Sequence, residues 1–184
     1  MALTEFSIDK LRSQIGNFAL GNRYSVIIYP PGTLNTSELG DVPKRLQYFC
    51  EAVSLPQKGL AGVQHELYGP PREIPYRETF TEAALSFYLD DSLFVKRFFD
   101  QWQDHIIDPA TGNPNYWSNI IGSIIISRLP NRADKLDWVI DDYKIELIEA
   151  YPTIVGEVAL GHNQGADVLR LNVTFKFRKW KYLG

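Results

Sequence analysis

The feature that most constrains the fold of this chain is a ten-residue alternation near its C-terminus. Apolar side chains occupy the odd positions, Leu169, Leu171, Val173, Phe175 and Phe177, and polar side chains occupy the even positions, Arg170, Asn172, Thr174, Lys176 and Arg178. A period of two places the two sets on opposite faces of a strand. Ten residues at ~3.3 Å each span ~33 Å, longer than most strands. The segment therefore predicts a long strand in an antiparallel sheet with one buried and one solvated face.

The alternation changes phase after this strand, because Trp180 and Tyr182 are apolar residues at even positions. A β-bulge near Lys179 is the simplest explanation. A second alternating segment covers residues 82–90. Its apolar side is Ala83, Leu85, Phe87 and Leu89, and its polar side is Glu82, Ser86, Tyr88 and Asp90. We expect both strands to contribute to one polar sheet face.

The rest of the chain is divided into short segments by 13 Gly and 11 Pro, and 13% of its residues are aromatic. Short, aromatic, turn-bounded segments favour a mainly β fold. Further strands are predicted at residues 23–29, 46–54, 120–127, 139–149 and 154–160. The predicted fold class is an antiparallel β-barrel or sandwich with one covering helix.

That helix is predicted at residues 92–106, with Ser92 as its N-cap. Its apolar stripe follows helical spacing and should face the core: Val95, Phe98, Phe99, Trp102 and Ile106. A shorter helix is predicted at residues 4–15. We therefore divide the chain into an N-terminal extension, residues 1–22, and a single β domain, residues 23–184.

Residues 57–79 contain six Gly or Pro residues and few features of a regular core element. We expect an extended hairpin or arm that reaches away from the core, because a long Gly/Pro-marked excursion within a domain is usually functional. Its apolar side chains are too numerous for an idle surface loop: Leu60, Val63, Leu67, Tyr68, Ile74 and Tyr76.

Nothing in the sequence assembles into a catalytic, cofactor or metal site. The three histidines share no metal-ligand spacing, and Cys50, the single cysteine, follows the pattern of a buried structural thiol. His105 is interpreted as a helix-end residue. Phosphate-binding glycine loops and hydrolase motifs are absent from the sequence. We expect no enzyme activity, no cofactor and no metal.

The overall balance is that of a globular protein made inside a cell. The 184 residues carry a formal net charge of −3, which argues against a dedicated nucleic-acid-binding protein. The row of Arg170, Lys176 and Arg178 is more simply a solvated sheet face than a phosphate-binding one. The sequence contains no apolar run of membrane-spanning length, so no membrane partner is expected.

Five segments, in order, resemble the tail tube proteins of contractile-tailed bacteriophages and their baseplate-joining relatives that initiate the tube. They are residues 48–56 (Cys-x-x-x-x-Leu-Pro), residues 68–76, residues 97–103, residues 149–152 (Glu-Ala-Tyr-Pro) and residues 173–180. The resemblance runs from about Tyr24 to Trp180 and so covers most of the chain.

The resemblance implies a structural virion protein of the phage tail, assembled in the host cytoplasm. Members form hexameric rings whose strands join into one inner β-barrel, and the rings stack into a tube. That tube conducts double-stranded DNA and holds the tape-measure protein, and it lies inside a contractile sheath and on a baseplate. In this family an arm at the position of residues 57–79 contacts the next ring. The polar face of residues 82–90 and 169–178 is then the candidate lumen lining.

Two alternatives stay open at this level. One is a baseplate-proximal ring that initiates the tube, and the other is a monomeric β-barrel module that binds a ligand. The lining also presents a problem, because a conduit for DNA should not be basic. We expect Glu82, Asp90, Glu146 or Glu149 to neutralise the basic row, unless part of that row contacts a neighbouring protein.

Overall fold

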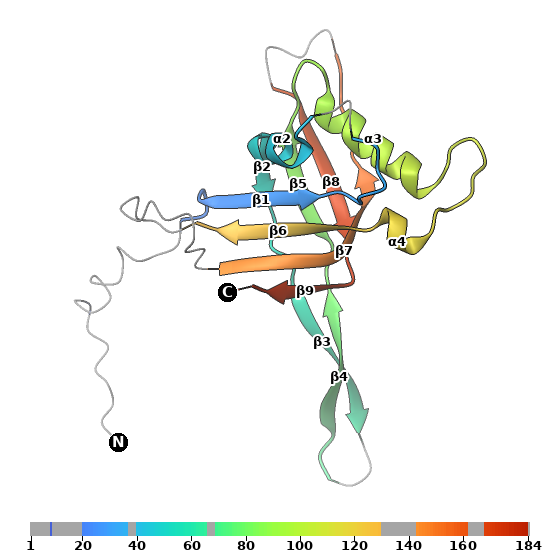
Figure 1. The fold of residues 1–184 in the computed structure, drawn as a ribbon. Coiled ribbons are helices and arrows are strands. Elements are labelled where there is room, and N and C mark those ends of the chain that lie inside the picture. Colours follow the sequence, from blue (N-terminus) through green and yellow to red (C-terminus); the bar gives the residue numbers. More distant parts are fainter. Residues whose placement is uncertain are drawn as a thin grey trace.

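The structure is a computed structural model, and it describes residue 8 and residues 20–36, 40–65, 69–129, 143–161 and 168–183 (Figure 1). The strands are β1 (Tyr24–Tyr29), β2 (Cys50–Val53), β3 (Lys58–His65), β4 (Arg72–Phe80), β5 (Ala83–Tyr88), β6 (Gly122–Arg128), β7 (Tyr143–Val155), β8 (Arg170–Lys176) and β9 (Lys179–Tyr182). The helices are α2 (Val42–Phe49), α3 (Phe94–Ile106) and α4 (Trp117–Ile120). The predicted fold class, mainly β with antiparallel sheets, is confirmed.

One bent antiparallel sheet carries the domain, in the order β1-β6-β7-β8-β5-β2, and β9 also pairs with β7 (Figure 1). The bend lies at Glu149 in β7. There Gly122 pairs with Ala150 and Ser123 with Ile148, which leaves Glu149 as an extra residue at φ 57°. A bulge of this kind turns a strand sharply. The first half of β7 therefore belongs with β6 and β9, and its last residues belong with β8.

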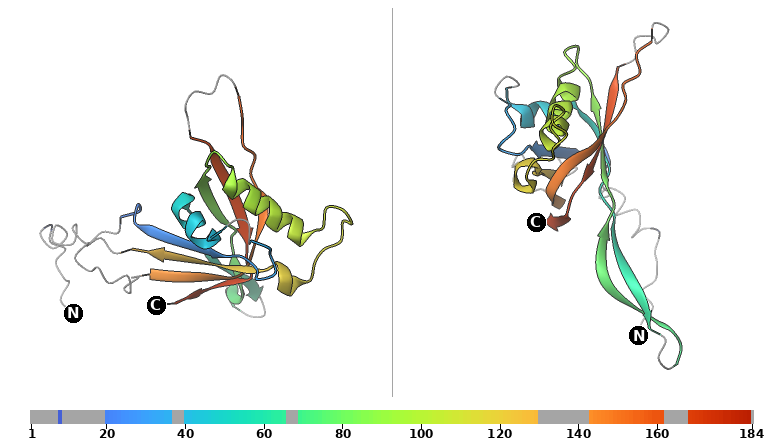
Figure 2. Two further views of the ribbon diagram at one scale, coloured as in Figure 1. Left: turned by 45° about the horizontal axis from the view of Figure 1, so that its top comes forward. Right: turned by 90° about the vertical axis from the view of Figure 1, so that its right-hand side faces the viewer.

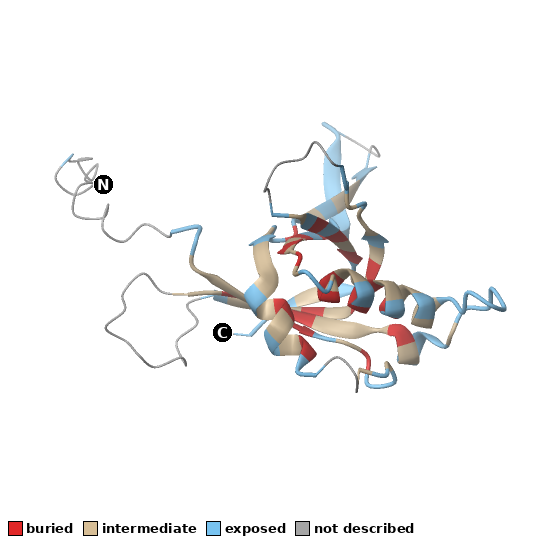
Figure 3. Cartoon of the chain, turned by 90° about the horizontal axis from the view of Figure 1, so that it is seen from above, coloured by how far each residue is buried: buried red, intermediate tan, exposed pale blue. Residues whose placement is uncertain are grey.

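We call β2, β5, β8 and residues 151–155 of β7 the four-stranded layer. Its apolar face packs against α3, and α2 packs against β1 and β5 (Figure 2). The largest fully buried side chains meet between the layer and α3: Phe87, Phe98, Phe99, Trp102 and Phe175. Their rings contact one another at centroid distances of 5.1–6.4 Å. Seen from above, the buried residues lie on α2 and α3 and on the part of the sheet that these helices cover (Figure 3).

The predicted helix stripe is placed at this core. Val95, Phe98, Phe99 and Trp102 are fully buried, and Ile106 is half-buried at the helix end. The predicted start is wrong, because α3 begins at Phe94 and not at Ser92. The residue before it, Leu93, is left-handed at φ 50°. Asp90 supplies the cap: its carboxylate accepts the Phe94 amide at 2.8 Å.

Trp102→Ala should lower the free energy of unfolding by roughly 3–5 kcal/mol, the range for large aromatic truncations in cores. Trp102 is fully buried, and its Nε1 also donates to the Ile120 carbonyl at 3.0 Å. Trp102→Phe is the matched control, since it keeps most of the packing and removes this hydrogen bond. Urea denaturation of both variants measures the two contributions. A loss below about 1 kcal/mol for Trp102→Ala would contradict the placement of the stripe in the core.

The strand predicted at residues 46–54 is wrong in its first half. Residues 42–49 form α2, and only Cys50–Val53 form a strand. Pro43 stands in the first helical turn, where its missing N–H costs nothing. Val42 and Leu46 are buried from one helical stripe, whereas Tyr48 is 81% exposed. The domain is therefore covered by a second helix beside α3.

The late strands also differ from their predicted bounds. Residues 154–160 do not form a separate strand, because β7 continues without a break to Val155 and no strand follows up to residue 160. The long final strand divides into β8 and β9, which pair in turn with the second and first halves of β7. A two-residue break at Phe177 and Arg178 takes the place of the predicted bulge at Lys179. This break lies opposite the bend at Glu149, so the two paired segments of the chain bend at the same place.

The predicted arm is a two-stranded sheet, β3 paired with β4, that extends well beyond the domain, and its pairing register shifts once, between Ala61 and Gly62 (Figure 2). A Cβ at Gly62 would collide with the Glu73 side chain, so a substitution there would require that exposed side chain to move. We call residues 58–80 the arm, and in this range the structure describes residues 58–65 and 69–80. The helix predicted at residues 4–15 lies outside the described residues apart from Ile8.

Candidate functional surfaces: a charge-paired sheet face and an apolar arm

The solvated face of the four-stranded layer is built by the register of β5 and β8. Ala84 pairs with Thr174, Ser86 with Asn172, and Tyr88 with Arg170. Directly opposite residues share a face, so this pairing brings together most of the predicted polar set. We call the following residues the polar face: Glu82, Ser86, Arg170, Asn172, Thr174, Lys176 and, in the same depression as Glu82 and Lys176, Arg178. Their assignment as a lumen lining stays a prediction.

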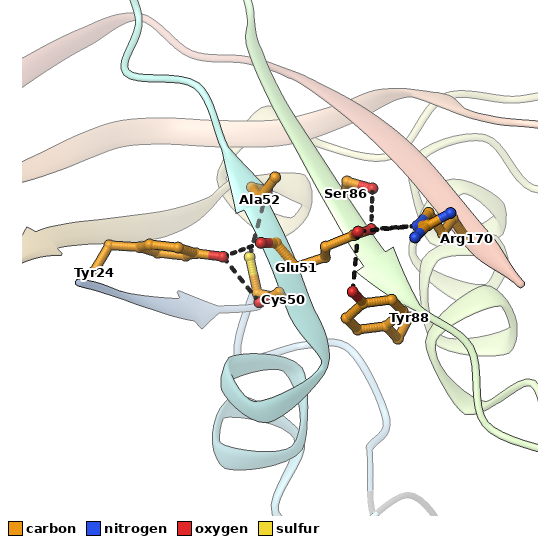
Figure 4. Close-up of polar contacts among 7 residues, drawn as sticks. All are labelled: Tyr24, Cys50, Glu51, Ala52, Ser86, Tyr88 and Arg170. Carbon is orange, nitrogen blue, oxygen red and sulfur yellow. Dashed lines mark hydrogen bonds and ion pairs between the residues drawn. The ribbon is translucent and has the colours of Figure 1, made fainter. Parts of the chain in front are cut away.

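Arg170 is paired with Glu51, a residue that the sequence pattern did not place on this face (Figure 4). Its Nε lies 2.9 and 2.8 Å from the two carboxylate oxygens of Glu51. Tyr88 donates to the same carboxylate at 3.0 Å, and Ser86 donates at 3.4 Å. The hydrogen bond to Glu51, followed by that to Tyr88, raises the pKa of Arg170 above its ordinary value. The Arg170 guanidinium therefore stays charged, and the Glu51 carboxylate beside it balances that charge.

A bulge in β2 directs Glu51 toward this face. Cys50 pairs with Phe87 and Ala52 with Ser86, so Glu51 is the extra residue between two ladder pairs. The backbone carbonyls of Cys50 and Glu51 accept hydrogen bonds from the Tyr24 hydroxyl of β1. The available sequence signal was that Glu51 is the only charged residue in the run from Leu46 to Ser54.

The other two cations of the basic row are also paired. Lys176 Nζ lies 3.2 Å from a carboxylate oxygen of Glu82, and Arg178 donates to Glu149 at 2.8 Å. Glu149 accepts a further hydrogen bond from the Trp117 indole at 3.2 Å. These hydrogen bonds, that from Arg178 first, lower the pKa of Glu149 below its ordinary value. The four charged residues line one shallow depression at the sheet corner. Two of the residues that we expected to neutralise the basic row, Glu82 and Glu149, thus lie beside its cations.

Asp90 belongs elsewhere. Besides capping α3, its carboxylate accepts a hydrogen bond from Ser92 at 2.5 Å and lies 3.4 Å from the Arg45 guanidinium of α2. These contacts lower the pKa of Asp90 against the opposing effect of burial, which is the largest single influence on it. The alternation of residues 82–90 therefore overextends the polar face by including Asp90, because β5 ends at Tyr88.

The arm carries large apolar side chains that the domain does not cover. Leu60 is 65% exposed, Val63 54%, Ile74 50% and Tyr76 68%. Val63 and Ile74 are directly paired across the two strands. Leu67 and Tyr68, also predicted for this surface, lie outside the described residues. A two-stranded ribbon is marginally stable alone, so this surface is suited to contact with another protein surface.

The side chains that could be chemically reactive, Cys50 and His105, lie in surroundings that give them structural roles. Burial raises the pKa of the Cys50 thiol to about 12, so the thiol stays protonated and unreactive at neutral pH. His105 Nε2 lies 3.0 Å from the Thr33 hydroxyl and 3.2 Å from the Asn119 carbonyl, which ties the end of α3 to neighbouring segments. Within the described ranges, no group of three or more His, Cys, Asp or Glu residues is arranged to hold a metal ion.

Membrane insertion through a helix finds no support in the described part of the chain. No helix there is both long enough and apolar enough to cross a bilayer.

Comparison with solved structures shows a shared fold at low sequence identity. A chain of an extracellular contractile injection system (PVC) sheath-tube complex in the extended state superposes with TM-score 0.58, 13% identity, and coverage of 97% of this chain and 98% of that one. A chain of the PVC sheath/tube terminator in the extended state superposes with TM-score 0.60 and 12% identity, and the match covers 99% of this chain and 100% of that one. A chain of the anti-feeding prophage baseplate superposes with TM-score 0.57 and 15% identity, and the match covers 91% of this chain and 96% of that one.

Sequence comparison identifies the family. No curated protein sequence matches the chain significantly. The family model described as phage tail tube protein matches residues 19–183, which is nearly the whole chain. The match includes the polar face, α3 and the arm, and the family is structural and not enzymatic. This chain therefore belongs to the phage tail tube protein family.

Proposed function

We propose that this protein forms hexameric rings that stack into the tube of a contractile tail, with the polar face lining a channel for double-stranded DNA. Membership of the tail tube family and the fold shared with chains of contractile injection systems support this proposal. Six subunits per ring follows from the family resemblance. In the assembled tail the partners are further copies of this chain, the sheath, the baseplate and the tape-measure protein.

The observation that carries the proposal is that the four-stranded layer ends, on each side, in a strand that has no further strand beside it in the described part of the chain. Among the described strands, β2 pairs only with β5, and residues 151–155 of β7 extend past the last pair that β7 makes with β6. All neighbouring strands in the layer are antiparallel. With four strands, β2 of one subunit would run antiparallel to β7 of the next, so copies can close into a continuous barrel. Closure removes edges that otherwise promote aggregation.

The arm supports stacking. It projects from the same layer, since β3 follows β2 and β4 leads into β5, and it carries the exposed Leu60, Val63 and Tyr76. A contact between two different surfaces of successive copies produces an open polymer when its rotation does not close into a ring. We assign this arm to ring-to-ring contact. The outer face of α3, which carries the Lys96–Asp100 ion pair at 2.5 Å, is then the side that faces the sheath.

Negative-stain microscopy and sedimentation of the purified full chain test the proposal. We expect rings of six subunits and, at higher protein concentration, tubes made of stacked rings. A protein that stays monomeric at all accessible concentrations would contradict the proposal and favour the ligand-binding β-barrel module.

A baseplate-proximal ring that initiates the tube is the second candidate. The observation in its favour is the superposition with a chain of the anti-feeding prophage baseplate. The same microscopy separates the two roles, because a dedicated initiator should yield single or paired rings that do not extend by themselves. Extended tubes from this chain alone would exclude that restricted role.

A further inference from the structure

The three cations of the basic row are accessible, yet each contacts a carboxylate that comes from a different segment of the chain. The exposed side-chain fractions are 58% for Arg170, 53% for Lys176 and 66% for Arg178. Their partners come from the bulge in β2, from the segment just before β5, and from the bend in β7. We call Glu51, Glu82 and Glu149 the counterion carboxylates.

Stability does not explain these pairs well. An exposed ion pair usually contributes about 0–1 kcal/mol, because water and salt screen the attraction. Their effect on surrounding charge is larger. An unpaired surface cation attracts phosphates within about a Debye length, ~8–10 Å at moderate salt. A carboxylate within 3.2 Å of the cation cancels most of that field at longer range.

The counterion carboxylates are placed where a polyanion would otherwise bind. Lys176 and Arg178 line the same depression, and Arg170 lies on the same strand six residues earlier, ~20 Å away at strand rise. Three free cations over this span would form a phosphate-binding track, as the alternation of Arg170, Asn172, Thr174 and Lys176 suggests. The paired face has equal numbers of acidic and basic groups in these contacts.

We propose that Glu51, Glu82 and Glu149 keep the polar face from binding the phosphate backbone of nucleic acid, so that duplex DNA moves along it without adhering. The inference rests on the proposed function, because it assigns the polar face to a channel. Removal of the carboxylates should therefore convert the face into a DNA-binding surface.

The experiment measures binding of a fluorescent 30-base-pair duplex to the purified full chain by anisotropy, over a series of salt concentrations. The variants are the double E82Q/E149Q and the triple E51Q/E82Q/E149Q. Each freed cation that meets a phosphate should add about 0.9 to the slope of log affinity against log salt. We expect slopes of roughly 2 and 3 for the two variants, and very weak binding by the unsubstituted protein.

The matched control is D41N/D100N, which changes the net charge by the same amount as E82Q/E149Q. It frees Lys44 and Lys96, whose ion pairs of 2.8 and 2.5 Å lie on α2 and α3, away from the polar face. We expect E82Q/E149Q to bind on the order of tenfold more tightly than D41N/D100N at low salt. Circular dichroism confirms that each variant is folded, and the double variant decides the question if E51Q unfolds.

Equal affinity of E82Q/E149Q and D41N/D100N would overturn the inference, since net charge alone would then explain binding. Failure of the double and triple variants to bind DNA would overturn it too. Tight binding by the unsubstituted protein would show that the pairs do not mask the cations. Assembly is scored separately by microscopy: absence of rings would contradict the proposed function, whereas the DNA affinities of the variants test the counterion role by themselves.

Discussion

Val173→Pro should leave no folded subunit and no assembly. Val173 is fully buried and lies in the centre of the layer, paired with Leu85 on one side and Val155 on the other. Four residues before Val173 on the same ladder, the Leu89 amide donates to the Leu169 carbonyl. Because bonded pairs alternate along an antiparallel ladder, Val173 occupies a hydrogen-bonded position opposite β5. Proline removes that donor and forces the strands apart.

Val173→Ala is the control, because it removes side-chain volume but keeps the backbone donor. We expect this variant to fold with a loss of about 1–3 kcal/mol, and Val173→Pro to be insoluble or unfolded by circular dichroism. Rings of normal appearance from Val173→Pro would refute the central position of β8.

Shortening the arm should abolish tubes while the subunit stays folded. Ala61 and Arg77 are paired, so residues 62–76 can be replaced by Asn-Gly, which forms a tight hairpin turn. The shortened arm keeps the Lys58–Glu78 ion pair at 2.6 Å and removes Val63, Ile74 and Tyr76. Since these side chains are exposed in the subunit, the thermal midpoint should change little. Sedimentation and microscopy should show single rings at most.

Two full-length controls separate apolar contact from arm length. Val63→Ser/Ile74→Ser replaces the exposed apolar pair, and Gln64→Ser/Glu73→Ser replaces the neighbouring polar pair. We expect the first to weaken tube formation strongly and the second to leave it nearly unchanged. Normal tubes from the shortened arm would exclude a stacking role, and an unfolded product would show that the arm belongs to the core.

The local sequence pattern was sufficient to predict an element whose apolar residues repeat with the period of a strand or a helix. The alternation of residues 169–177 predicted β8, and the spacing of Val95, Phe98, Phe99 and Trp102 predicted the buried stripe of α3. Both signals arise because one face of each element is covered by the core, so side-chain chemistry follows the geometry of the backbone. The arm was visible in the same way, from glycines, prolines and exposed apolar residues at 57–79.

Tertiary pairing decided the rest. Residues 46–49 alternate like a strand, but Val42 and Leu46 bury one stripe against β1 and β5, and this packing selects a helix. The pairing of Glu51 with Arg170 joins residues 119 positions apart through a bulge, which no local pattern reports. The sequence alone therefore determined which face is polar and that the face is basic along β8. Only the fold determined that each cation there has a carboxylate beside it, because register and bulges between distant strands set those distances.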